Sequence, residues 1–206
     1  NLFKPSPRCL EALRTMEMED LYLYDLRRND ELMDVLSSSL EISASHIFIH
    51  NGSAEVIKSI FSILLRENDT VFIPEPGWSY YKSVADAKFA KCISYRVEEK
   101  GDAYRYSIED LMDKAKRYHP RVIVITSPQM PTGCTIADEE IEKIIKSHPE
   151  SVIMLDEAYW GYGDDSNRFE REMITKYSNV VITRTFSKFY GLANIRIGYG
   201  LCSYPL

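Results

Sequence analysis

Three runs of consecutive aliphatic residues constrain the possible folds of this chain more than any other feature. They are RVIVITS at 121–127, SVIML at 151–155 and VVITRT at 180–185. Their central parts do not alternate apolar with polar residues, which is typical of strands covered on both faces of a sheet. An amphipathic helical pattern, ADEEIEKIIKSH at 137–148, separates the first two runs. Strands that alternate with helices predict βαβ units and a mainly parallel sheet.

Shorter runs of the same kind extend this pattern along the chain. The last of them follows its predecessor too closely to leave room for a crossover helix, so we expect it to be antiparallel. We expect these additional strands at HIFIH (46–50), TVFIP (70–74), KCISYRV (91–97, followed by a charged turn) and IRIGYGLC (195–202). We expect further helices within 29–40, 54–68, 77–87 and 107–118. The sequence therefore predicts an α/β protein with three α/β/α layers and a mainly parallel sheet of roughly seven strands.

The composition favours a folded protein and gives no sign of a nucleic-acid or membrane partner. With 45% hydrophobic residues the chain has enough apolar material for a core. We divide it into an N-terminal leading segment and helix over residues 1–40 and one large domain over residues 41–206. A net charge of -6 gives no reason to expect binding to nucleic acid or to an anionic membrane. No apolar run is long enough to span a bilayer.

The spacing of cysteines and histidines argues against a metal centre. His46 and His50 bracket a predicted strand on one face, but no carboxylate or cysteine is placed to complete a site, so we interpret them as structural and expect no metal. The cysteines are far apart and form no CxxC or Cys/His cluster: Cys9, Cys92, Cys134 and Cys202. This spacing predicts no disulfide framework and favours a reducing compartment, hence a cytoplasmic location.

The stretches with the most unusual chemistry all follow predicted strands. They are NGSAE (51–55), PEPGW (74–78), SPQMPTG (127–133), DEAY (156–159) and TFSK (185–188). In open parallel sheets the ligand site lies beyond the carboxyl ends of the strands. We therefore expect these five stretches to meet at one edge of the sheet and to form a binding site there.

One part of this edge has the character of an anion site. The backbone N–H groups of Gly52, Ser53 and Ala54 would point outward at a helix N-terminus, where an anion is favoured. Taken alone, this loop is better explained by Ser53 capping the helix. Arg196 could reach back from the next strand to hold a phosphate, or it could be an ordinary surface residue. Thr185 and Ser187 alternate along an extended segment and so share a side.

The remaining candidates each have two interpretations. Lys188 is either a solvated lysine or, held next to cations and out of water, a nucleophile towards carbonyls. Asp156 ends an aliphatic strand, where a carboxylate is costly without a cationic or donor partner. It could alternatively cap the following turn, three residues before Tyr159. Trp78 or Tyr81 could stack on a flat ligand, or each could be a core aromatic residue at the start of a helix.

Taken in order, NGSAE, PEPGWSYY, SPQMPTG, LDEAYWGY and TRTFSKFYGLANIRIGYG resemble the motifs of fold-type I pyridoxal-phosphate enzymes, the class I/II aminotransferases. The resemblance covers essentially all 206 residues. It is strongest to the histidinol-phosphate aminotransferase branch, whose members also open with a segment like Asn1 to Leu13. The last motif is the most specific of the five. The resemblance implies the large domain of such an enzyme, without its C-terminal small domain.

The resemblance also implies roles for individual residues around pyridoxal 5'-phosphate. Lys188 would form a Schiff base with the cofactor, and Asp156 would pair with the ring nitrogen. Tyr159 would contact the ring 3-hydroxyl, and Trp78 would stack on the ring. The phosphate would be held by Gly52, Ser53, Ala54, Thr185, Ser187 and Arg196. Tyr24 occupies the place from which this family sends a tyrosine to the neighbouring subunit, which implies a homodimer.

Two departures from the family pattern stand out. The family usually has NNPTG, with an asparagine that contacts the ring 3-hydroxyl, whereas Met130 occupies that position here. Methionine cannot donate a hydrogen bond, and Gln129 is the neighbouring candidate to compensate for the loss. The arginine that binds the substrate carboxylate lies in the family's C-terminal domain, and we find no match for it in this sequence.

The function implied by the resemblance is transamination between an amino acid, or an amino-acid-like substrate, and a keto acid. Two alternatives remain open. A decarboxylase or lyase of the same fold, similar to threonine-phosphate decarboxylase, would use the same cofactor residues. A non-catalytic pyridoxal-phosphate-binding module would keep the site without the reaction. The retention of Lys188, Asp156 and Tyr159 favours an enzyme.

Overall fold

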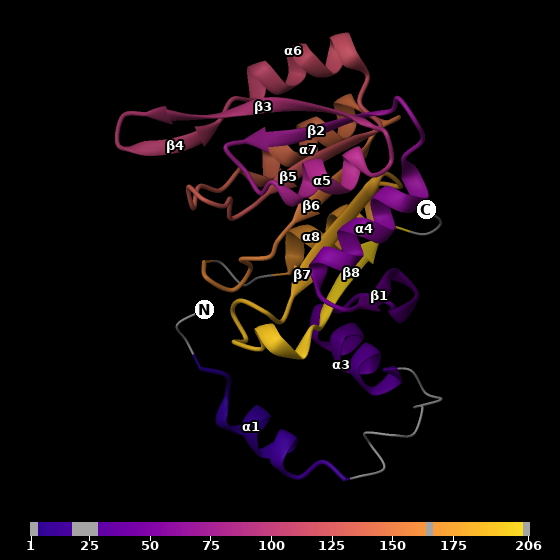
Figure 1. Cartoon of the computed structure of the whole chain (residues 1–206), viewed down its shortest axis with the longest axis vertical. Coiled ribbons are helices and arrows are strands. Elements are labelled where there is room, and N and C mark those ends of the chain that lie inside the picture. The colour runs from indigo at the N-terminus through magenta and orange to yellow at the C-terminus, as the bar shows by residue number, and fades with distance from the viewer. Residues whose placement is uncertain (1–3, 18–28, 164–166, 204–206) are drawn as a thin grey trace.

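The computed structural model describes residues 4–17, 29–163 and 167–203, and these form one mixed sheet of eight strands flanked by helices (Figure 1). The strand order is β1-β8-β7-β6-β5-β2-β3-β4. The strands are β1 (Ile47–His50), β2 (Thr70–Glu75), β3 (Lys91–Lys100), β4 (Ala103–Tyr106), β5 (Val122–Thr126), β6 (Val152–Asp156), β7 (Val180–Thr185) and β8 (Gly198–Cys202).

The sheet is mainly parallel, as the sequence predicts. Strands β2, β3, β5, β6 and β7 pair in parallel. Strand β8 is antiparallel to β7, which confirms the expectation for the last run. Strand β1 is antiparallel to β8 and therefore points the same way as β7. The carboxyl ends of β1, β2, β5, β6 and β7 consequently lie at the same edge.

Helices cover both faces of the sheet and complete the three predicted layers. Helices α4 and α5 pack on one face, and α6, α7 and α8 pack on the other (Figure 1). The helices are α1 (Pro7–Arg14), α3 (Asp30–Leu40), α4 (Ser53–Leu64), α5 (Tyr80–Asp86), α6 (Ile108–Tyr118), α7 (Asp138–Ser147) and α8 (Arg168–Lys176), with short 3₁₀ turns η1 (Ala44–His46) and η2 (Ala193–Ile195).

The side-chain alternation of β6 shows how each face is assigned. Val152 and Met154 pack in the apolar cluster beneath α4 and α5, whereas Ile153 and Leu155 pack in the cluster beneath α6, α7 and α8. Successive side chains of a strand point to opposite faces. A strand buried on both sides must therefore be apolar at every position, which is why the run lacks polar alternation. Asp156, the last residue of β6, continues the α4/α5 face.

One local expectation was wrong. We interpreted the residues after 97 as a charged turn, but β3 continues to Lys100 and pairs with β4 in an antiparallel hairpin. The turn consists of Gly101 and Asp102 alone, and Gly101 adopts a φ of +65°, as a tight hairpin turn requires. The charged residues of this segment lie on a solvent-facing edge, where they discourage pairing with other chains.

The N-terminal part of the described chain contains two unlike helices. Helix α1 has no buried residue and lies apart from the sheet in Figure 1. Helix α3 instead buries Leu36 and Leu40 in the apolar cluster on the α6–α8 side. The division of the chain at residue 40 stays a prediction. Among the described residues, no helix has the length and apolar character needed to cross a membrane.

Candidate functional site

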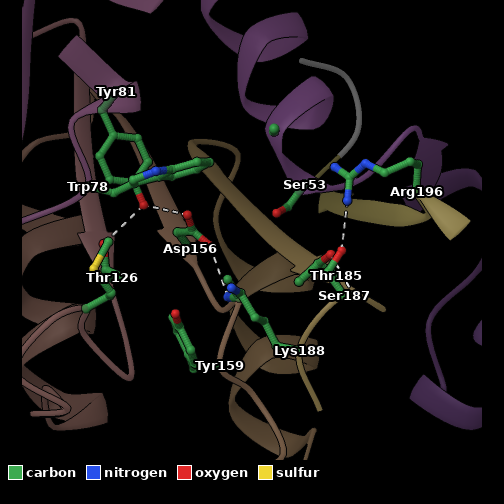
Figure 2. Close-up of a pocket in the computed structure, with 13 residues that line it drawn as sticks. Ser53, Trp78, Tyr81, Thr126, Asp156, Tyr159, Thr185, Ser187, Lys188 and Arg196 are labelled. Atoms are coloured by element: carbon green, nitrogen blue, oxygen red, sulfur yellow. Dashed lines mark hydrogen bonds between the residues drawn. The ribbon is translucent and has the colours of Figure 1, made fainter. Parts of the chain in front are cut away.

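The loops that follow the carboxyl ends of the central strands meet around a cavity of about 260 Å³ (Figure 2). Nine of the predicted site residues line it: Ser53, Ala54, Trp78, Asp156, Tyr159, Thr185, Ser187, Lys188 and Arg196. Four further lining residues were absent from that prediction: Tyr81, Thr126, Met130 and Ala158. Of the other two predicted residues, Gly52 lies behind the cavity wall against Arg196, and Tyr24 lies outside the described residues.

Asp156 forms one end of the cavity and is almost completely buried, with 1% of its surface exposed. Its Oδ2 accepts a hydrogen bond of 2.5 Å from the Tyr81 hydroxyl, and its Oδ1 accepts one of 3.0 Å from the Ala158 N–H. Burial raises the pKa of Asp156, and these two hydrogen bonds oppose the rise. Both sequence interpretations hold in part, because the carboxylate caps the following turn and also faces the cavity.

Tyr81 has a role that the sequence did not predict, because the motif PGWSYY offered it only as a residue that could stack on a flat ligand. It belongs to the first turn of α5, three positions after Trp78, and its ring is 1% exposed. Its hydroxyl lies 3.3 Å from Thr126 Oγ1 as well as against Asp156. The available signal was a hydroxyl-bearing aromatic residue directly after a strand-tip loop. Its partner could not be inferred, because Asp156 is 75 positions further along the chain.

The opposite end of the cavity is built from the start of α4. Gly52 is the N-cap residue, with φ 84° and no side-chain cap, so Ser53 is the first helical residue and does not cap α4. The first N–H groups of a helix have no acceptor within the helix and favour an anion. A Cβ on Gly52 would lie 2.4 Å from Arg196 Nη2. Glycine therefore lets the guanidinium approach the helix terminus.

Arg196 is held in place beside this helix terminus. It adopts a left-handed backbone conformation with φ 58°. Its Nη1 donates hydrogen bonds to Ser187 Oγ at 3.0 Å and to the Ala193 carbonyl oxygen at 2.9 Å. Thr185 Oγ1 accepts a bond of 3.1 Å from the Ser187 N–H, so the two hydroxyl residues lie together as the alternation predicted. A cation, two hydroxyls and a helix N-terminus thus converge on one small region.

Lys188, Tyr159 and Trp78 lie along the cavity between its two ends (Figure 2). The Lys188 ammonium is 5.3 Å from the centroid of the Tyr159 ring. Trp78 contacts Tyr81 edge-on, with ring centroids 5.6 Å apart, and stacks on Tyr80 at 4.7 Å. The aromatic ring that lines the cavity is thus fixed by its neighbours. An amine, a phenol and a flat aromatic wall therefore surround the same space.

The departure at Met130 is also visible in the structure. Met130 lines the cavity, but Gln129 does not. Gln129 Nε2 donates to the Pro76 carbonyl oxygen at 2.5 Å, and its Oε1 accepts hydrogen bonds from the N–H and hydroxyl of Thr132. The structure does not support compensation by Gln129, because its amide joins two loops and does not line the cavity.

Within the described residues, no cluster of three or more histidine, cysteine, aspartate or glutamate side chains could hold a metal ion. The cavity instead offers a carboxylate at one end, an anion site at the other and a lysine between them. This arrangement suits an elongated organic molecule with a cationic and an anionic end.

Comparison with known proteins agrees with this geometry. The family model described as "Aminotransferase class I and II" matches residues 23–206. Histidinol-phosphate aminotransferase 2 of Thiobacillus denitrificans is 31% identical over 206 residues, covering 100% of this chain and 55% of the relative. The crystal structure of histidinol-phosphate aminotransferase from Sinorhizobium meliloti in complex with pyridoxal-5'-phosphate superposes with a TM-score of 0.85 at 23% identity, covering 97% of this chain and 53% of that one.

A second solved structure shows how widely the fold is shared. Cystalysin from Treponema denticola, whose structure contains a pyridoxal 5'-phosphate cofactor, superposes with a TM-score of 0.81 at 16% identity, over 98% of this chain and 54% of that one. These likenesses confirm the fold as the large domain of the pyridoxal-phosphate transferases. The chain spans about half the length of the relatives that it matches.

Proposed function

The chain belongs to the family of class I and II aminotransferases, and we propose that it is the cofactor-binding domain of a pyridoxal 5'-phosphate-dependent aminotransferase. The substrate would be an amino acid or a similar amine, with a keto acid as the second substrate, as in histidinol-phosphate aminotransferase. The observation that carries this proposal is the convergence of Lys188, Asp156 and the Arg196 anion site on one cavity. Relatives of about 30% identity over the whole chain support it.

The residues present fit this cofactor on physical grounds. Asp156 is buried among neutral hydrogen-bond donors, and burial raises its pKa. A protonated ring nitrogen at this point would supply a cation and favour the carboxylate. At the other end, the Gly52 turn brings Arg196 against the α4 N-terminus, which matches a phosphate group. Trp78 would cover the face of the ring.

These residues would perform distinct tasks. When bound, the cofactor acts as an electron sink for the Cα carbanion of the substrate. Lys188 would attach the cofactor covalently and, once displaced by the substrate amine, would act as general base at the substrate Cα. Asp156 would keep the ring nitrogen protonated, and Tyr159 would donate to the ring 3-oxygen. The anion site would hold the cofactor still while bonds change at its other end.

Transamination is preferred over two alternatives. A decarboxylase or lyase could be built on the same residues, and the fold also matches cystalysin, so the fold alone does not separate them. The relatives with about 30% identity are named histidinol-phosphate aminotransferases, which favours transamination. A non-catalytic binding module could use Lys188 to hold the cofactor, but the joint retention of Lys188, Asp156 and Tyr159 favours an enzyme. We further propose that the protein is a cytoplasmic homodimer in which Tyr24 contacts the partner's phosphate site.

Cofactor addition tests the proposal directly. Pyridoxal 5'-phosphate added to the purified chain should produce a visible absorption band, and borohydride reduction should fix the label on the peptide that contains Lys188. Lys188→Ala should abolish both results. Lys82→Ala is the matched control, because Lys82 is an exposed lysine of α5 paired with Asp86 and lies outside the cavity. If the unmutated protein gives no band, or if the label is found on other lysines, the proposed function is wrong.

A further inference from the structure

A buried cluster of charged groups lies on the reverse side of the sheet edge that carries the cavity. At its centre is Arg184 of β7, whose side chain is 2% exposed. Its Nε donates a hydrogen bond of 2.6 Å to Glu157 Oε2, and its Nη1 donates one of 2.6 Å to Asn167 Oδ1. Its Nη2 lies 3.1 Å from Glu170 Oε1. The guanidinium also lies 4.3 Å from the centroid of the Trp160 ring.

The position of this cluster follows from strand alternation. Thr183 and Thr185 of β7 point to the α4/α5 side, so Arg184 between them points to the α6–α8 side. For the same reason Glu157, one residue after Asp156, turns away from the cavity. The Glu157 N–H donates to the Thr183 carbonyl oxygen at 2.9 Å and continues the pairing of β6 with β7. The cluster therefore stands directly behind the cavity wall.

Arg184 holds both ends of a short segment that carries two proposed cofactor contacts. Glu157 directly follows Asp156, and Trp160 directly follows Tyr159. The guanidinium hydrogen-bonds the first of these two neighbours and stacks on the second. Its contact with Asn167, the N-cap residue of α8, ties the segment to the next helix. One side chain thus connects β6, β7, the loop after β6 and α8.

The segment has open space on both of its sides. A second cavity of about 310 Å³ lies on its reverse side and is lined by Glu157, Tyr159, Trp160 and Glu170 among others. Tyr159 lines both cavities. Because a wall with space on both sides can shift, its position must be set by directional contacts. Arg184 supplies such directional contacts, because it hydrogen-bonds Glu157 and stacks on Trp160.

The cluster is not arranged for maximum stability. Three ionisable side chains are buried together, and taking each ion out of water costs several kcal/mol. Burial raises the pKa of Glu157 to about 8, with Arg184 opposing the rise and Glu170 adding to it. Among the described atoms, Glu170 Oε2 and Trp160 Nε1 are buried without a hydrogen-bond partner. Apolar residues of similar size would stabilise such a position at least as well.

We propose that Arg184 is a positioning residue that holds Asp156 and Tyr159 in place against the cavity. Its value to a reaction rests on the proposed function, but the positioning itself can be measured in the ligand-free protein. An arginine is needed because its planar fork can bond two residues and stack on a third at the same time. Lysine would keep the charge and lose this simultaneous grip. The groups that face Arg184 from neighbouring elements are Glu157, Glu170, Trp160, Asn167, Tyr190 and Tyr199.

The test compares Arg184→Lys with Arg168→Lys in ligand-free protein. Arg168 is a matched control because it is also paired with a glutamate, at 2.9 Å, but its side chain is 80% exposed. The titration of the Asp156 carboxyl carbon and the chemical shift of the Tyr159 phenol carbon are followed by ¹³C NMR. In Arg184→Lys, water should reach a loosened Asp156, and its pKa should fall towards the ordinary value of about 3.9. The Tyr159 signal should move or broaden, and both should stay unchanged in Arg168→Lys.

A milder variant keeps the test decisive if Arg184→Lys does not fold. Asn167→Ala removes only one arm of the grip and should cause a smaller change in the same direction. A purely structural arginine could lower the unfolding temperature but would leave the Asp156 titration of the folded protein unchanged. If the Asp156 titration is unchanged in whichever of Arg184→Lys and Asn167→Ala folds, the proposal is overturned.

Cofactor binding separates this inference from the proposed function. If the unmutated protein binds pyridoxal 5'-phosphate, Arg184→Lys should raise the dissociation constant about tenfold, and Arg168→Lys should not change it. If the unmutated protein binds none while the Asp156 titration still responds to Arg184→Lys, the positioning role stands and the proposed function fails.

Discussion

Asp156 and Glu157 are adjacent carboxylates at the end of the same strand, and the protein treats them in opposite ways. Both are buried, with 1% and 5% of their surfaces exposed. Asp156 faces the cavity and accepts hydrogen bonds from the neutral Tyr81 hydroxyl and a backbone N–H. Glu157 faces the other side of the sheet and accepts a hydrogen bond of 2.6 Å from the Arg184 guanidinium.

This difference indicates that Glu157 is a structural carboxylate, whereas Asp156 is available to bind a cationic group in the cavity. Glu157 has its cation built into the fold, so Arg184 offsets part of the cost of its burial, although burial still raises the pKa of Glu157 to about 8. Within the part of the chain that the structure describes, the hydrogen bonds to Asp156 come from neutral donors, and burial still raises its pKa, so a cationic group that enters the cavity would favour the carboxylate. Such burial of a carboxylate costs stability and is typical of functional sites. The pair therefore predicts opposite consequences for mutations at neighbouring positions.

The largest effect on stability is expected at Glu157, the carboxylate that is paired with Arg184. Glu157→Ala removes the carboxylate that receives the Arg184 Nε and should lower the free energy of unfolding by roughly 3 kcal/mol, because a buried charge loses its main partner. Denaturant unfolding of the ligand-free protein measures this change. Glu172→Ala, which frees the exposed Arg168, is the control and should have no measurable effect. Equal stabilities of the two variants would contradict the comparison.

Mutation of Asp156 should change the free energy of unfolding in the opposite direction. Asp156→Asn should stabilise the ligand-free protein by roughly 2 kcal/mol at about pH 8, since it removes a buried charge whose pKa is raised by burial. Because burial raises the pKa of Asp156, the folded protein binds a proton more tightly than the unfolded chain. That contribution to stability is lost as the pH rises from about 3.9 through the folded-state pKa.

The gain from Asp156→Asn should therefore vanish at about pH 4. Unfolding curves at both pH values measure it. The hydrogen bonds can adapt, because the Tyr81 hydroxyl also lies 3.3 Å from Thr126 Oγ1 and can turn to donate there. A destabilised Asp156→Asn protein at about pH 8 would show that Asp156 is already compensated within the fold. The same variant should lose affinity for pyridoxal 5'-phosphate.

The comparison also shows what the sequence could predict. Asp156 was identifiable because it ends an aliphatic run, and strand direction placed it at the same edge as Lys188. The same alternation places Thr185 on the cavity side. These inferences need only strand period and direction, which are local properties of the chain. The assembly of the candidate site from five strand tips is therefore readable in the sequence.

Contacts between distant segments were not readable. The hydroxyl of Tyr81 meets Asp156 because α5, which packs beside β2 and β3, directs the Tyr81 ring towards the end of β6, and nothing in either segment specifies that contact. Arg184 showed no partner because α8, which supplies Asn167 and Glu170, was not anticipated. Its sequence RFEREMITK is largely charged, and tertiary packing of Met173 and Ile174 decides its helical state. The hairpin of β3 and β4 was also missed, because its charged residues resemble a turn and only the pairing of the two strands defines it.

A smaller effect is expected at Tyr81, whose hydroxyl donates a hydrogen bond to Asp156. Tyr81→Phe removes the 2.5 Å hydrogen bond to Asp156 Oδ2, which stabilises the charged form. The pKa of Asp156 in the ligand-free protein should rise further, because one of the causes that lower it is lost. Affinity for pyridoxal 5'-phosphate should fall roughly tenfold. Tyr80→Phe is the control, since Tyr80 stacks on Trp78 outside this hydrogen bond. Parallel behaviour of the two variants would contradict a special role for Tyr81.

The smallest effect is expected at Met130, which lines the cavity. Met130→Asn would place an amide donor where the chain now has a thioether. A donor near the ring 3-oxygen withdraws electron density, so the pH midpoint of the cofactor's visible band should fall by roughly half a unit. Met130→Leu keeps the volume without a donor and should leave the midpoint unchanged. If the asparagine variant titrates like the leucine variant, position 130 does not reach the ring. The contrast between Asp156 and Glu157 would then account for the electrostatics of the site without it.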